Sequence, residues 1–184
     1  MARVPYLTPD DLAPEDRDLL KRPITLHRAL ANSPGMARAF GTLGGHIRHG
    51  STLDPRLREL AIIQVGYLTR SAYEYSHHCR LGVEQFGVNA EDIHGISRET
   101  EVEGSGGFPD LDAAVLRAAR EMVTDLAIDD ATYATLEAEL DRADLIDLIV
   151  TIGFYCGVVR ILASLQIDVE DDYALWLEQF PLPD

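Results

Sequence analysis

The sequence has few of the residues that mark several familiar classes of protein. Only two cysteines, Cys79 and Cys156, occur among 184 residues, and two thiols so far apart do not make a disulfide framework. Basic residues are also scarce, because 16 Lys and Arg stand against 31 Asp and Glu, for a net charge of −15. An acidic surface repels nucleic acid and anionic membranes, so we expect neither as a partner.

Several motifs and segments are missing as well. There is no Gly-x-Ser-x-Gly sequence, and the glycine-rich stretch at 104–107 follows no strand that would make it a phosphate loop. The first residues lack the apolar core of a signal peptide. The longest apolar run, 145–165, is interrupted by Asp147 and Arg160, which is typical of a buried helix rather than a membrane span. We therefore expect a cytoplasmic protein.

Helical periodicity is what the sequence does contain. Apolar residues recur at intervals of three and four along most of the chain, and strand-like alternation of useful length is missing. The pattern predicts an all-α fold around an antiparallel helix pair, 55–68 and 72–86, closed by a long apolar helix at 144–165. Residues 97–109 are predicted to form a surface loop. Further helices are predicted over 8–20, 26–30, 34–50, 90–96, 111–123, 129–140 and 169–179.

The most informative segment is 56–88. Ser71, Glu74 and His78 are spaced by three and four residues, which places them on one face of a helix. Glu59 lies on the preceding helix and should be near, because the connection between the two helices is short. A carboxylate beside an imidazole can donate and accept a proton during catalysis. Spacing alone favours the plainer interpretation, a structural Glu–His pair on a solvated face.

Three longer motifs change that balance. RLRELAI (56–62) begins one helix, YEYSHH (73–78) lies in the next, and GFYCGVVRILASLQI (153–167) follows later. Together they resemble the carboxymuconolactone decarboxylase / alkylhydroperoxidase D-like superfamily over about residues 34–167. The resemblance implies an alkylhydroperoxidase D-like helical bundle that assembles as a homo-trimer or homo-hexamer. It also implies one domain, 1–184, with an N-terminal helical extension (1–33) and a C-terminal segment (168–184).

The hydroperoxidase branch of this superfamily carries a relay glutamate, a Cys-x-x-Cys pair and a histidine. The resemblance maps the glutamate onto Glu59, the histidine onto His78, and the two cysteines onto Ser71 and Glu74. Because neither thiol is present, the dithiol peroxidase mechanism is not expected. Cys79 lies about 100° around the helix from His78, and we expect it to pack in the core; a one-cysteine peroxidase is the alternative.

The resemblance therefore favours a lyase or isomerase of the decarboxylase type that uses no cofactor and acts on a small organic acid or lactone. Glu74 and His78 would supply acid–base catalysis, Glu59 would relay protons, and Ser71 and Tyr73 would donate hydrogen bonds to an oxyanion. Candidates for substrate binding are Tyr73, His77, Tyr155 and Arg160. A non-catalytic oligomeric binding protein is a further alternative.

Arg160 and the Glu-x-x-His motifs each have an alternative interpretation. Arg160 could bind a substrate carboxylate, although an ion pair with Asp144, Asp147 or Glu74 is slightly favoured. Glu-x-x-His occurs at 74–77 and 91–94, which is half of a di-iron motif. A di-metal site also needs inward carboxylates from two more helices, so we expect no metal.

Overall fold

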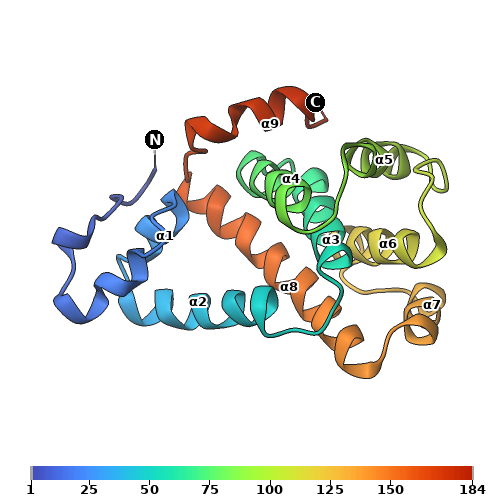
Figure 1. Cartoon of the computed structure of the whole chain (residues 1–184), viewed down its shortest axis with the longest axis horizontal. Helices are drawn as coiled ribbons and strands as arrows, with labels where there is room; N and C mark the ends of the chain where they lie inside the picture. Colours follow the sequence, from blue (N-terminus) through green and yellow to red (C-terminus); the bar gives the residue numbers. More distant parts are fainter. Residues whose placement is uncertain (1, 184) are drawn as a thin grey trace.

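The computed structural model describes residues 2–183, and that range contains helices and no strand (Figure 1). The predicted all-α fold is confirmed. The elements are η1 (Pro9–Asp11), η2 (Pro14–Leu20), α1 (Thr25–Leu30), α2 (Pro34–His49), α3 (Pro55–Leu68), α4 (Ala72–Gln85), α5 (Ala90–Glu101), α6 (Asp110–Thr124), α7 (Asp130–Glu139), α8 (Arg142–Leu165), η3 (Asp171–Tyr173) and α9 (Ala174–Gln179).

Local capping residues set most of the helix starts. The side chains of Asp54, Asn89, Asp129 and Asp141 accept hydrogen bonds from backbone N–H groups in the first turns of α3, α5, α7 and α8. Such caps satisfy donors that have no partner within the helix. Because caps are encoded by adjacent residues, the observed starts agree closely with the predicted ones.

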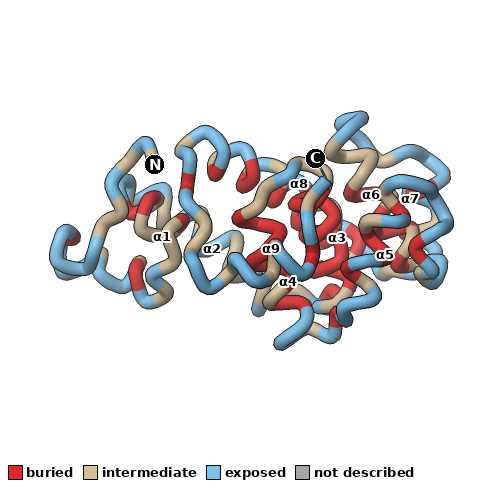
Figure 2. The backbone as a smooth tube through the Cα atoms, turned by 90° about the horizontal axis from the view of Figure 1, so that it is seen from above, coloured by how far each residue is buried: buried red, intermediate tan, exposed pale blue. Residues whose placement is uncertain are grey.

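The centre of the molecule is the helical hairpin of α3 and α4. Gly66 of α3 allows the two helices to approach closely, because a Cβ atom there would lie 3.0 Å from the backbone of Tyr75. Nearly every side chain of α3 is buried, as expected for a helix surrounded by others. Figure 2 shows the buried backbone concentrated in α3, α4 and α8, whereas the N-terminal part is mostly exposed or half-buried.

The long helix α8 packs one face against α3 and α6. Leu148, Ile152, Tyr155 and Val159 are buried there, whereas Ile146 on another face is exposed. Within residues 2–183, α8 alone is long and apolar enough to cross a membrane by length and composition. Its buried face confirms the prediction of a core helix.

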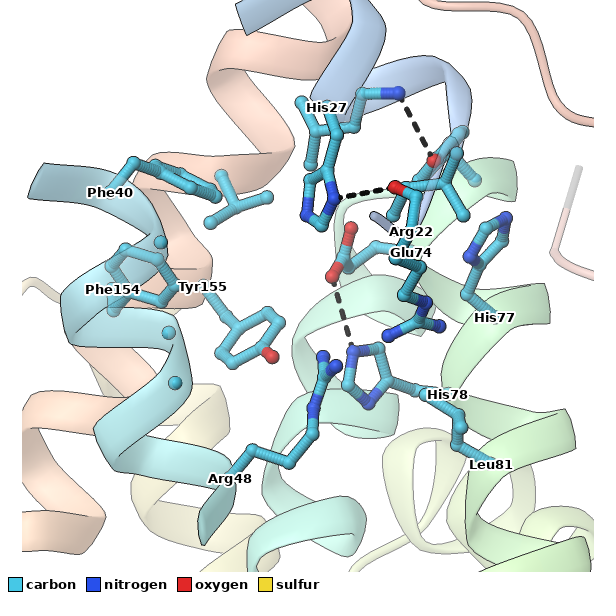
Figure 3. Close-up of a pocket in the computed structure, with 17 residues that line it drawn as sticks. Arg22, His27, Phe40, Arg48, Glu74, His77, His78, Leu81, Phe154 and Tyr155 are labelled. Carbon is cyan, nitrogen blue, oxygen red and sulfur yellow. Dashed lines mark hydrogen bonds and ion pairs between the residues drawn. The ribbon is translucent and has the colours of Figure 1, made fainter. Parts of the chain in front are cut away.

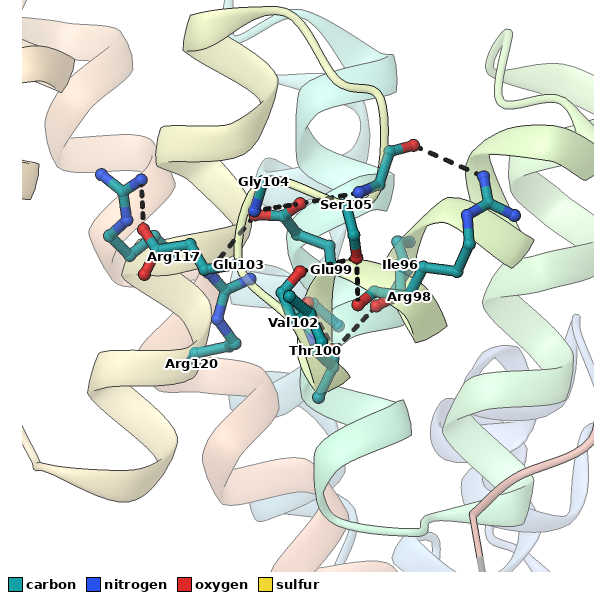
Figure 4. A network of polar contacts seen from close by, with 12 residues as sticks. Ile96, Arg98, Glu99, Thr100, Val102, Glu103, Gly104, Ser105, Arg117 and Arg120 are labelled. Atoms are coloured by element: carbon teal, nitrogen blue, oxygen red, sulfur yellow. Dashed lines mark hydrogen bonds and ion pairs between the residues drawn. The ribbon is translucent and has the colours of Figure 1, made fainter.

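Two predicted segments differ from the structure. The helix predicted over 8–20 is two short 3₁₀ helices, because Ala13 precedes Pro14 and has extended backbone angles, which a residue before proline prefers. Helix α5 continues to Glu101, five residues beyond the predicted end. The buried Glu99 carboxylate accepts hydrogen bonds from the N–H groups of Gly104 and Gly106, which folds the loop back onto α5 (Figure 4).

Candidate functional site

The structure brings Glu59, Glu74 and His78 together at the α3–α4 interface. His78 Nδ1 lies 2.5 Å from Glu59 Oε2, and His78 Nε2 lies 3.2 Å from Glu74 Oε1. The three side chains are at most 7% exposed. Glu74 and His78 are one turn apart on α4, and Glu59 approaches from α3. The imidazole therefore has a carboxylate at each ring nitrogen, and solvent reaches none of the three freely.

Opposite charges outweigh the effect of burial in this cluster. Burial by itself would lower the pKa of His78, but Glu59 and Glu74 raise it above its ordinary value. Burial would likewise raise the pKa of Glu59, but His78 and Arg58 hold it below its usual range. Arg58 Nε donates to Glu59 Oε1 at 3.0 Å. The stable form is thus an imidazolium paired with the Glu59 carboxylate.

A cavity of about 230 Å³ opens beside this cluster (Figure 3). Glu74 and His78 are part of its wall, whereas Glu59 lies behind His78 and is not among the lining residues. Glu74 Oε2 is buried and, within residues 2–183, has no hydrogen-bond partner. The other lining residues are Arg22, Ile24, Leu26, His27, Phe40, Gly41, Gly44, Gly45, Arg48, Tyr73, His77, Leu81, Phe154, Tyr155 and Val158.

Tyr155, one of the predicted binding residues, packs directly against His78. Its ring packs edge-on against His78, with ring centroids 5.0 Å apart and an interplanar angle of 83°. Burial and the nearby Glu74 raise the pKa of the Tyr155 hydroxyl, while the charge of Arg48 acts in the opposite direction. The hydroxyl therefore stays protonated and can donate a hydrogen bond at the cavity wall.

Ser71 and Arg160 are not among the residues that line the cavity, so the structure does not bring these two candidates together with the others. Ser71 is the N-cap of α4 and so precedes the helical face that carries Glu74 and His78. Arg160 is exposed on α8 and donates a hydrogen bond to the carbonyl of Cys156. It forms no ion pair with the acidic residues proposed for it, all of which lie in the described range.

His77 and Tyr73 line the cavity, but their polar atoms are engaged elsewhere. The His77 ring is stacked between Tyr73 and Tyr173, with centroid distances of 4.1 and 3.6 Å. Its Nε2 lies 2.8 Å from Glu170 Oε2, and the Tyr73 hydroxyl donates to Glu170 Oε1 at 3.3 Å. The structure therefore directs the Tyr73 hydroxyl to Glu170 rather than to the expected oxyanion.

Glu170 joins three segments that are distant in the sequence. Besides His77 and Tyr73 of α4, it accepts hydrogen bonds from the N–H and hydroxyl groups of Thr25 at the start of α1. Burial acts to raise its pKa, but the hydrogen bonds from His77 and from the Thr25 N–H hold it at about 2. This carboxylate thus anchors the C-terminal segment and the N-terminal extension to the wall of the cavity.

We expect Glu170→Gln to lower the free energy of unfolding at pH 7 by about 2 kcal/mol, because several hydrogen bonds to a charged acceptor are weakened. The folded-state pKa is depressed, so the wild-type contribution is present above pH 4.5 and is lost as the pH falls towards 2. The difference between the two proteins should shrink over that window in urea titrations. Glu178→Gln, at an exposed position, is the control, and an equal loss in the control contradicts the anchoring role.

The two thiols lie away from the cavity wall. Cys79 is fully buried, and burial raises the pKa of its thiol well above the ordinary value. Cys156 is half-buried on α8, and burial raises its pKa as well. Within residues 2–183, no group of three or more His, Cys, Asp or Glu side chains could hold a metal ion.

The sequence did not single out Arg22, His27 or Arg48, although all three line the cavity. Arg22 and His27 belong to the N-terminal extension, and Arg48 lies in the last turn of α2. No local spacing relates them to Glu74 or His78. The one signal near Arg48 is the pair Gly44–Gly45, whose small size leaves room on the face of α2 that borders the cavity.

Part of the chain matches a known protein family in sequence. Residues 34–121 match the model of the carboxymuconolactone decarboxylase family, and this segment includes Glu59, Glu74 and His78. None of the curated proteins compared with the chain matches it in sequence.

Three solved structures share the fold. The alkylhydroperoxidase AhpD core structure of an uncharacterized peroxidase-related protein from Ralstonia eutropha JMP134 has a TM-score of 0.78 and 16% identity, covering 99% of this chain and 98% of that chain. A protein of unknown function from Agrobacterium tumefaciens has a TM-score of 0.65 and 17% identity, and the match covers 77% of this chain and 94% of that chain. An uncharacterized peroxidase-related protein from Silicibacter sp. TM1040 has a TM-score of 0.60 and 16% identity, and the match covers 79% of this chain and 76% of that chain. The match over residues 34–121 and the shared fold together support the resemblance to the carboxymuconolactone decarboxylase / alkylhydroperoxidase D-like superfamily.

Proposed function

We propose that the protein is a lyase or isomerase of the decarboxylase type that moves protons on a small organic acid or lactone. The observation that carries this proposal is the state of Glu74. One of its oxygens contacts His78, the other is buried without a partner in the described chain, and the residue lines the cavity. A buried carboxylate oxygen without a partner is costly, so its retention at a cavity supports a role in proton transfer.

In the proposed reaction, Glu74 removes a proton from a carbon next to a carbonyl group; the electron pair of that C–H bond forms a C=C bond, and the π electrons of the carbonyl group move onto its oxygen. His78 holds Glu74 in place through its Nε2, and Tyr155 donates a hydrogen bond to the developing oxyanion. Return of the proton to another carbon completes an isomerisation. In decarboxylation, the electrons of the breaking C–C bond enter the carbonyl system as CO₂ leaves; the carbon then takes a proton that passes from the His78 imidazolium through Glu74, and solvent returns that proton to His78.

Glu59 and Arg58 act as positioning residues behind this pair. Glu59 accepts from His78 Nδ1 and so fixes the orientation of the ring. The Arg58 guanidinium holds Glu59 in turn and lies over the Phe86 ring, 4.5 Å from its centroid. Neither residue lines the cavity. As the resemblance implies, we include assembly into a homo-trimer or homo-hexamer in the proposal.

The proposal is tested by exchange of substrate protons with solvent. A panel of small lactones and keto acids is incubated with the enzyme in D₂O, and loss of the proton signals next to the carbonyl group is followed by NMR. We expect enzyme-dependent exchange in at least one compound. The absence of enzyme-dependent exchange, and of enzyme-dependent decarboxylation, across the panel would contradict the proposal.

A peroxidase that uses Cys79 is the second candidate, because two of the structures that share the fold are described as peroxidase-related. The burial and raised pKa of Cys79 oppose it, since the thiolate is the reactive form. We therefore expect Cys79→Ser to retain proton exchange and to leave any thiol-dependent consumption of an organic hydroperoxide unchanged. Hydroperoxide turnover by the wild type that disappears in Cys79→Ser would instead establish the one-cysteine peroxidase.

A further inference from the structure

We propose that Arg22 and Arg48 form a carboxylate-binding subsite, so that the substrate is a monocarboxylate with a small apolar body. The inference rests on the proposed function, because it assigns the substrate class of the same cavity. It also gives the N-terminal extension a part in substrate recognition, since Arg22 lies outside the residues that match the family model.

The charges around the cavity are the first argument. Arg58 balances Glu59, and the His78 imidazolium balances Glu74. Within residues 2–183, neither Arg22 nor Arg48 forms an ion pair with a carboxylate, although the chain carries an excess of 15 negative charges. Two unbalanced guanidinium groups at one small cavity favour an anionic ligand there, and the planar guanidinium matches a carboxylate well.

The directions of the two side chains are the second argument. Arg22 follows η2, and Arg48 lies near the C-terminal end of α2, so they reach the cavity from different segments. Figure 3 shows both guanidinium groups directed toward His78. A carboxylate held between them would place the neighbouring carbon near Glu74 and His78, where the proposed proton transfer takes place.

The remaining wall is suited to an apolar group. Phe40 and Phe154 pack together with ring centroids 4.9 Å apart and lie away from Arg22 and Arg48 in Figure 3. A Cβ atom added at Gly41 or Gly45 would meet nothing within 4 Å, so these glycines leave open space along α2. The cavity volume of about 230 Å³ is smaller than that of pockets for drug-sized ligands, which suits a compact monocarboxylate.

A neighbouring hollow shares part of its wall with the cavity and is the proposed entrance. It has a volume of about 390 Å³ and lies between η2 and α2. His27, Phe40 and Gly41 line both spaces. The N-terminal extension therefore borders both the proposed entrance and the proposed carboxylate subsite.

The test is a binding measurement that does not depend on turnover. Phenylacetate and phenylacetamide have nearly the same shape and differ in charge, and their affinities are measured by calorimetry at pH 7. We expect the wild type to prefer phenylacetate by at least about 10-fold, and Arg22→Gln and Arg48→Gln each to weaken phenylacetate binding by about 10- to 100-fold. Arg160→Gln is the matched control on the exposed surface and should bind as the wild type does.

Two results would overturn the subsite. One is equal affinity for the acid and the amide, or no binding of either in the millimolar range. The other is a loss in Arg160→Gln as large as the loss in the cavity variants. Arg22 is half-buried and has no described ion pair, so Arg22→Gln serves as the folded test if Arg48→Gln is unstable in thermal denaturation.

Failure of the subsite and failure of the proposed function are distinguishable with Glu74→Gln. This variant removes a negative charge beside the cavity, so it should bind phenylacetate at least as well as the wild type while losing proton exchange. Retained exchange in Glu74→Gln argues against the proposed function and leaves the arginine subsite standing. Loss of exchange without any preference for the acid argues against the subsite alone.

Discussion

Glu74→Gln is expected to lower the rate of proton exchange by about 10²- to 10⁴-fold, the range contributed by a general acid or base. Glutamine has nearly the same size and keeps an acceptor and a donor near His78, but it cannot accept the substrate proton. The wild-type carboxylate is buried, with Oε2 lacking a described partner. Replacing this carboxylate with an amide should therefore leave the fold intact and change the melting temperature by only a few degrees.

The matched control is Glu84→Gln, a change of the same type on the same helix. Glu84 is exposed and pairs with Arg80 one turn away, and exposed pairs of this kind contribute little to stability. Exchange and melting temperature should both match the wild type. If Glu74→Gln kept the wild-type exchange rate at saturating substrate, Glu74 would not be the base, and the proposed chemistry would fail.

Arg58→Met is expected to lower the free energy of unfolding by about 3 kcal/mol, because it removes one partner of a buried ion pair. Arg58 is 3% exposed and Glu59 is 1% exposed. Arg58 also donates to the carbonyls of Ile47 and Arg48 at the end of α2, so its loss uncouples α2 from α3. Chemical denaturation at pH 7 measures the effect, with Arg142→Met at an exposed site as the control, expected within about 0.5 kcal/mol of the wild type.

The pH dependence of that loss tests its electrostatic origin. The pKa of His78 is raised in the folded protein, so its contribution to stability is full below about pH 6.5 and is lost as the pH rises through the folded-state value. In Arg58→Met, Glu59 depends on His78 alone for an opposite charge. The destabilisation should therefore grow with rising pH. A loss that does not vary with pH would point to packing against Phe86 rather than to charge.

Local chemistry explains why much of the fold could be predicted. Helix starts such as Asp54–Pro55 and Asn89 depend on side chains that cap their own helix within one turn, so adjacent residues are sufficient to find them. One failed prediction had a cause outside the helix itself: α5 extends to Glu101 because Glu99 is stabilised by the backbone of the following loop. A loop that folds back onto a helix leaves no periodic signal in the sequence.

The sequence by itself determined that Glu74 and His78 lie side by side. With 3.6 residues per turn, Glu74 and His78 must share a face of α4 and Cys79 must lie off it, and the resemblance identified Glu59 as their neighbour. Ser71 did not join them because α4 begins only at Ala72. Arg160 follows Tyr155 by five residues, which turns it about 140° around α8 from the cavity wall.

Only the tertiary structure decided the surroundings of that pair. Arg22 and Arg48 reach the cavity from separate segments, and Glu170 binds His77 from 93 residues away. The physical reason is that periodicity relates residues within one helix, whereas charge pairing and burial depend on which helices come to pack together. The helical spacing thus placed Glu74 beside His78, and the packing of α2, α4, α8 and the N-terminal extension determined which charges face the cavity.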